Sequence, residues 1–111
     1  MTYNEPLYTF VETKLFTRLI QRYLTDEEYG RLQTAIVEDP TIGDVVPGSG
    51  GVRKLRWAVR GRGKRGGVRV IYYLRRRLGE IWMLTAYAKN EAETMPAHIL
   101  KSIKEELDGQ D

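Results

Sequence analysis

The sequence contains no cysteine and only one histidine, His98, among its 111 residues. The lack of cysteine excludes disulfides, thiolate metal sites and a thiol nucleophile, and it favours a reducing cytoplasm as the location. A lone histidine is a poor basis for a metal site or a catalytic triad, so we expect His98 to be a surface or helix-packing residue. No apolar run approaches the length of a membrane span, and the start, MTYNEPLYTF, lacks a basic segment followed by an apolar one. We therefore expect a protein that is neither secreted nor inserted in a membrane.

Acidic residues are also absent from positions 45–79, whereas 11 of the 26 residues in 52–77 are Lys or Arg. Crowded like charges repel one another and cost stability, so a fold that keeps them usually has an anionic partner. The alternative is a basic surface that only meets solvent. Because Mg²⁺ prefers carboxylate oxygens, this block holds no ligands for it, and we expect no metal or other cofactor.

The hydrophobic pattern predicts one α+β domain that spans residues 1–111. A short β-type run over 7–11 precedes a helical pattern over 14–24, and a second helix begins after Thr25, where T-D-E-E can form a capping box with Glu28. That helix stops before Asp39-Pro40. Alternating patterns over 53–60 and 68–74, followed by a run over 81–87 that is apolar on both faces, predict an antiparallel meander. A C-terminal helix follows Met95-Pro96. The order β-α-α-β-β-β-α predicts a twisted antiparallel sheet with an N-terminal helical hairpin and a C-terminal helix on one face, the other face being open.

The glycine-rich segment 61-GRGKRG-66 has the letters of a dinucleotide-binding loop but not its context. Such a loop needs a helix N-terminus after the glycines, and here the β-branched run VRVI follows. It is not a Walker loop either, because Lys64 is followed by Arg65. What remains is a hairpin loop with three cations, which either decorates the surface or grips phosphates.

The cations of the predicted strands 53–60 and 68–74 share one face of the sheet. Lys54, Arg56 and Arg60 alternate with apolar residues in the strand 53–60, and Arg69 lies on the same side of the strand 68–74 as Tyr73. Tyr87 and Lys89 follow at alternating positions and could point to the same place. RNA can be cleaved on such a surface without metal, because its 2′-OH is the nucleophile and guanidiniums can stabilise the charge of five-coordinate phosphorus.

The segment GDVVPGSGGVRKLRWAVRGRGKRGGVRVIYY, followed by LTAYAKNE, resembles the RelE/ParE superfamily of bacterial type II toxins, and most of all its HigB-type branch. The resemblance covers nearly the whole chain. It implies a RelE-like fold and a ribosome-dependent endoribonuclease, an mRNA interferase that enters the ribosomal A site, contacts rRNA and cuts mRNA. It also implies a cognate antitoxin, which for a HigB-type toxin would be HigA-like and carry a helix-turn-helix domain. We expect 2′-OH attack to leave a 2′,3′-cyclic phosphate.

The resemblance also implies roles for single residues. Arg69 matches the arginine that contacts the scissile phosphate, and Lys54 and Arg56 stand where RelE-type members place lysines proposed for proton transfer. Tyr87 and Lys89 match the last motif, but Asn90 stands where some members have arginine, so the general acid stays open. The expected catalytic residues are Lys54, Arg56, Arg69, Tyr87 and Lys89, and the expected RNA-binding residues are Arg53, Arg60, Arg62, Lys64, Arg65 and Tyr73.

Two other functions stay open on the sequence alone. A ParE-like inhibitor of DNA gyrase would share the fold without needing a cationic catalytic face. A non-catalytic nucleic-acid-binding module would use the same basic block, with an affinity that falls steeply with salt. The sequence specifies neither the codon preference nor whether the antitoxin covers the active face.

Overall fold

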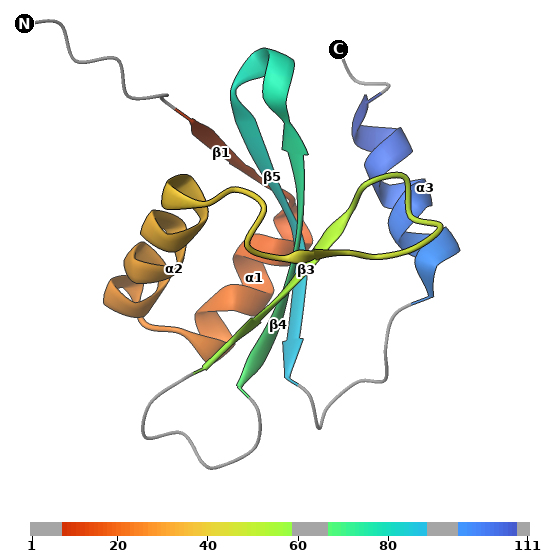
Figure 1. The fold of residues 1–111 in the computed structure, drawn as a ribbon. Helices are drawn as coiled ribbons and strands as arrows, with labels where there is room; N and C mark the ends of the chain where they lie inside the picture. The colour runs from red at the N-terminus through yellow and green to blue at the C-terminus, as the bar shows by residue number, and fades with distance from the viewer. Residues whose placement is uncertain (1–7, 59–66, 89–95, 109–111) are drawn as a thin grey trace, which may run out of the picture.

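The computed structural model describes residues 8–58, 67–88 and 96–108 (Figure 1). One mixed sheet with strand order β1-β5-β4-β3-β2 lies between the helices. The expected α+β fold is therefore confirmed. The elements in chain order are β1 (Thr9–Glu12), α1 (Lys14–Tyr23), α2 (Asp26–Glu38), β2 (Asp44–Val45), β3 (Arg53–Trp57), β4 (Val68–Arg75), the short 3-10 helix η1 (Arg76–Leu78), β5 (Glu80–Ala88) and α3 (Ala97–Asp108).

Two details of the sheet differ from the predicted antiparallel meander. The first strand, β1, lies parallel to β5, with Thr9 opposite Glu80 and Glu12 opposite Met83. These two strands are not joined by a tight turn, so nothing in the chain connection requires them to be antiparallel. A further strand, β2, pairs at the other edge through Asp44 and Val45 alone. Two residues are too few to give an alternating pattern, which is why the sequence predicted only a connection there.

Each face of the sheet has its own apolar core. Under α1 and α2, residues Phe16 and Leu32 pack with sheet residues that include Leu55 and Met83. On the opposite face, Leu100 of α3 packs with a second cluster of sheet residues. Figure 1 shows α1 and α2 on one side of the sheet and α3 on the other. The prediction that all helices share one face is therefore wrong, because the second face is itself apolar and needs cover. This second core consists of Val52, Ile71, Trp82, Leu84, Tyr87 and Leu100.

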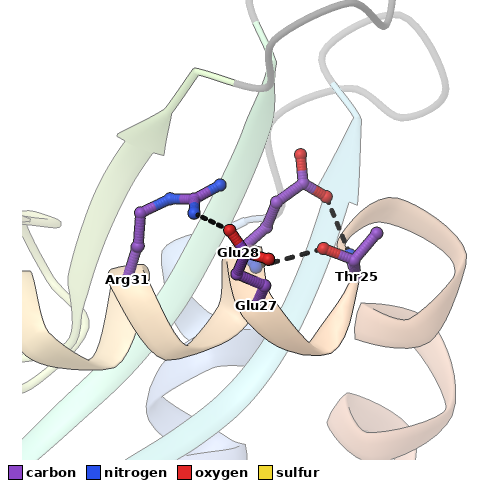
Figure 2. A network of polar contacts seen from close by, with 4 residues as sticks. All are labelled: Thr25, Glu27, Glu28 and Arg31. Atoms are coloured by element: carbon purple, nitrogen blue, oxygen red, sulfur yellow. Dashed lines mark hydrogen bonds and ion pairs between the residues drawn. The ribbon is translucent and has the colours of Figure 1, made fainter.

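The start of α2 has the predicted capping box, which Figure 2 shows. The Glu28 amide donates to Thr25 Oγ1 over 3.1 Å, and the Thr25 amide donates to Glu28 Oε1 over 2.8 Å. One turn further on, Arg31 pairs with Glu27 on the exposed surface. The cap satisfies amides that the first helical turn leaves without partners. None of the described helices is both long and apolar enough to cross a membrane.

A buried tyrosine fixes the turn that leads into β2. Tyr72 has no exposed surface, and its hydroxyl donates to the Pro40 carbonyl over 2.7 Å and accepts from the Gly43 amide over 3.0 Å. A Cβ on Gly43 would lie 2.9 Å from Tyr72 Cε1. The close approach of backbone to ring thus requires glycine at this position.

We expect the protein to lose stability at alkaline pH because of Tyr72 and Tyr29. Burial raises the pKa of Tyr72, and burial together with the hydrogen bond to Glu12 raises the pKa of Tyr29. As the pH rises, both tyrosines ionise at about pH 10 in the unfolded chain and only at higher pH in the folded chain. Their ionisation therefore leaves the free energy of unfolding unchanged below about pH 10 and lowers it above that, with a slope of at most about 1.4 kcal/mol per pH unit for each tyrosine.

Urea unfolding between about pH 8 and pH 11 measures this slope. The variants Tyr72→Phe and Tyr29→Phe each remove one ionisable group and should flatten the curve, although each also starts from a lower stability. A parent curve that stays level above about pH 10 would contradict the prediction.

Candidate functional site

Three side chains form a row across neighbouring strands at one end of the sheet. Arg56 on β3 lies opposite Arg69 on β4, and Arg69 lies opposite Tyr87 on β5. Directly opposite residues of antiparallel strands point to the same face, with Cβ atoms about 5 Å apart. Lys54 lies on this face too, two residues before Arg56 and opposite Ile71. We call Lys54, Arg56, Arg69 and Tyr87 the basic row; they are four of the predicted catalytic residues.

Exposure is low for the members of the basic row on β5 and β4 and higher for the two on β3. Tyr87 is 9% exposed and Arg69 is 8% exposed, whereas Arg56 is exposed and Lys54 is half-buried. The packing around Arg69 and Tyr87 restricts their rotamers, so their polar ends are held in place before any ligand arrives. Arg56 has more freedom and can approach a ligand from solvent.

The two guanidiniums of the basic row are positive charges that the protein cannot remove by losing a proton. Arg56 and Arg69 are directly opposite, and like charges in that position destabilise a sheet. Within the described ranges, no ion pair joins Lys54 or Arg56 to an acidic side chain. A guanidinium stays charged at any physiological pH. An anionic ligand such as a phosphate would therefore be stabilised here, and it would relieve the repulsion between the strands.

Other ligand chemistry has less support in the described part of the chain. There, no three His, Cys, Asp or Glu side chains lie close enough together to hold a metal ion. His98 is exposed on α3, in agreement with the surface position expected for it. The groups that the basic row offers are two guanidiniums, one ammonium and one phenol. They can stabilise negative charge and donate protons.

Tyr87 reaches the basic row only because β5 contains a β-bulge. Ile71 lies opposite Thr85, but the next residue of β4, Tyr72, lies opposite Met83, so Leu84 is an extra residue in β5. Strict alternation would put Tyr87 on the same face as Met83, under the helical hairpin. In the structure Tyr87 instead shares the α3-side core with Leu84. The alternating pattern of the sequence carried no signal of this shift.

Two predicted RNA-binding residues lie away from the basic row. Arg53 shares a face with Leu55, and its Nη1 donates to the carbonyl oxygens of Gly43 over 2.7 Å and Thr41 over 3.3 Å. Tyr73 is half-buried, with its ring centroid 6.3 Å from that of Trp82 and 5.0 Å from Lys104 Nζ of α3. These contacts give Arg53 and Tyr73 packing roles, and RNA binding by either residue stays a prediction.

The remaining predicted residues, Arg60, Arg62, Lys64, Arg65 and Lys89, lie outside the described residues. The described residues nearest to them in the sheet, Trp57, Val68 and Ala88, pair with one another directly beside the basic row. Roles in RNA binding and catalysis stay predictions for all five.

No protein-family model matches the chain. Among solved structures, it is similar to a double mutant of the E. coli toxin RelE in the free state, with a TM-score of 0.59. The match covers 88% of this chain and 97% of that chain, and 15% of the residues are identical. A sequence identity of 15% supports a shared fold and no shared activity. On this similarity, and on the mixed sheet with a helical hairpin on one face and a C-terminal helix on the other, the chain has a RelE-like fold.

Proposed function

We propose that the protein is the toxin of a toxin–antitoxin pair and acts as an endoribonuclease on mRNA. The observation that carries the proposal is the basic row, in which Arg56 and Arg69 lie side by side, and Tyr87 completes the row on the next strand. The fold is that of a protein described as a toxin, which supports the proposal without naming the substrate.

The reaction that fits these residues is transfer of the phosphate to the neighbouring 2′-OH. A bond forms between the 2′-oxygen and phosphorus while the bond from phosphorus to the 5′-oxygen breaks. The 2′-OH gives its proton to a base, for which water can serve, and the 5′-oxygen takes one from an acid of the site. The products are a 2′,3′-cyclic phosphate and a 5′-OH end. Arg69 and Arg56 would stabilise the charge on phosphorus, which is a large catalytic contribution in a fixed site. Lys54 and Tyr87 carry protons close to the same place.

The HigB-type motifs support a finer version of the proposal. In this version the toxin cuts mRNA in the ribosomal A site in the cytoplasm, in contact with rRNA, and a cognate HigA-like antitoxin with a helix-turn-helix domain neutralises it. The basic row is four side chains on three strands and would contact few nucleotides by itself. A ribosome that holds the mRNA in line would therefore supply much of the positioning that this reaction needs.

The test maps RNA ends after purified protein is added to a translating extract and, separately, to the same mRNA without ribosomes. We expect new ends within A-site codons in the translating extract alone, with 3′ termini that need removal of a cyclic phosphate before ligation. No new ends in either sample would contradict the proposal. Inhibited supercoiling by DNA gyrase would then indicate the ParE-like alternative, and salt-dependent RNA binding without cleavage would indicate a binding module.

A further inference from the structure

We propose that Thr13 is a positioning residue for the basic row: its hydroxyl holds the β5 bulge in place, and the bulge keeps Tyr87 on the face of Arg69. Thr13 itself lies at the other edge of β5, next to β1, and contacts no residue of the basic row through the bonds described below. It would act on the row through the register of β5.

The hydroxyl of Thr13 has two partners in two different elements. It accepts from the Phe16 amide over 2.9 Å and so caps α1, and it donates to the carbonyl oxygen of Leu84 over 2.8 Å. The Thr13 amide also donates to the Met83 carbonyl over 3.1 Å. Thr13 thus fastens the start of α1 to the extra residue of the bulge and to the residue before it.

The bulge occurs where the parallel pairing with β1 ends. Glu12 is the last residue of β1 and lies opposite Met83, and Leu84 follows at once. Leu84 is 1% exposed, so its carbonyl oxygen has little access to water. A buried carbonyl without a donor is costly. Leu84 is the residue that the bulge leaves without a partner in β4, so a donor for its carbonyl stabilises the bulged register over a straight one.

A straight register would change which residue faces Arg69. If the pairing of Tyr72 with Met83 continued without a bulge, Ala86 would lie opposite Arg69 in place of Tyr87. Tyr87 would then move to the row of Val68 and turn toward the helical hairpin. The basic row would lose its phenol while the fold as a whole stayed the same.

The variant Thr13→Asp separates the two functions of the hydroxyl. Aspartate caps a helix as well as threonine does, so α1 keeps its acceptor for the Phe16 amide. The ionised carboxylate cannot donate, so the Leu84 carbonyl loses its partner. Losing one hydrogen bond of ordinary net strength shifts the ratio of the two registers by about tenfold.

Cross-strand nuclear Overhauser effects between backbone protons report the register directly. In Thr13→Asp we expect the contact between Arg69 and Tyr87 to weaken and one between Arg69 and Ala86 to appear. The pair Leu74 and Ile81, beyond the bulge, should be unchanged and serves as the internal reference. Thr13→Ser keeps the hydroxyl and should match the parent protein.

The matched control is Thr25→Asp, the same substitution at the N-cap of α2. Thr25 bonds to Glu28 of its own helix, as Figure 2 shows. The inference is wrong if Thr13→Asp keeps the Arg69 to Tyr87 contact at parent intensity, or if Thr25→Asp weakens it equally. If Thr13→Asp does not fold, the same spectra of Thr13→Val test whether the Thr13 hydroxyl holds the register. Valine fills a similar volume and has neither a donor nor a charge.

A second readout rests on the proposed function. In a translating extract, Thr13→Asp should cleave mRNA more slowly than the parent, by the same factor by which the population of the bulged register falls in the spectra, and Thr25→Asp should cleave at close to the parent rate. If the parent cleaves no RNA, the proposed function fails while the spectra still decide whether Thr13 holds the register. If the spectra show the shift but Thr13→Asp cleaves at the parent rate, Tyr87 is not needed for cleavage and Thr13 is not a positioning residue for it.

Discussion

The variant Arg69→Gln should cleave mRNA about 100-fold to 1,000-fold more slowly than the parent, because removing one fixed group that stabilises transition-state charge has an effect of this size. Glutamine keeps much of the aliphatic stem, so the buried side chain, 8% exposed in the parent, still fills most of its space. The rate constant for cleavage in a translating extract measures the effect. Arg69→Lys keeps the charge but not the planar guanidinium group, so its rate constant should lie between those of the parent and Arg69→Gln.

The matched control for Arg69→Gln is Arg18→Gln, which removes the same charge from the exposed surface of α1. That helix covers the other face of the sheet, so the control should cleave at close to the parent rate. Thermal unfolding of both variants shows whether they are folded. A folded Arg69→Gln protein that cleaves as fast as the parent would show that the basic row is not the site.

The variant Gly67→Ala should lose a large part of the stability of the protein. Gly67 has a φ of 60°, a left-handed conformation that costs other residues about 1–2 kcal/mol. An added Cβ would overlap the carbonyl oxygen of Trp57 and lie 2.9 Å from its carbonyl carbon. Relief requires the ends of β3 and β4 to separate, at a further cost of about 1–3 kcal/mol. Since domains of this kind are stable by about 5–15 kcal/mol, urea unfolding should show the loss clearly.

The strand ends that Gly67→Ala would separate also carry the basic row. Trp57 pairs with Val68 directly beside the pair of Arg56 and Arg69, so cleavage should fall even in protein that remains folded. The control is Gly30→Ala in the middle of α2, where an added Cβ meets nothing within 4 Å. Alanine should stabilise that helix by about 0.5–1 kcal/mol. Equal effects of the two substitutions would mean that the contact with Trp57 does not matter.

Local features of the sequence were enough to predict most helices and strands. The capping box at Thr25 and the stop at Asp39-Pro40 depend on residues within one turn of each other, and α2 begins and ends there. The alternation in β3 correctly predicted that Lys54 and Arg56 lie on one face of the sheet, together with Arg69, and Leu55 on the other. Such patterns are readable because the period of each element is set by its own backbone.

The roles of Arg53 and Tyr73 could not be read in the same way. Both stand among the basic and aromatic residues that suggested RNA binding, yet Arg53 bonds to the turn at Gly43 and Tyr73 packs beside Lys104. Their partners lie 10 and 31 positions away in the chain. Composition shows what a side chain is able to bind, whereas folding decides which partner is next to it.

By itself, the sequence determined the α+β class, the bounds of the long elements and the cationic face of β3 and β4, because each follows from periodicity and charge over a few neighbouring residues. Only the tertiary structure decided that β1 lies parallel to β5, that α3 covers the second face and that Tyr87 faces Arg69. The last of these depends on one extra residue, Leu84, whose carbonyl bonds to Thr13 from 71 positions earlier in the chain. A bulge of this kind shifts every following side chain to the other face. The hydrogen bond that we propose to hold it is long-range, and no local pattern encodes it.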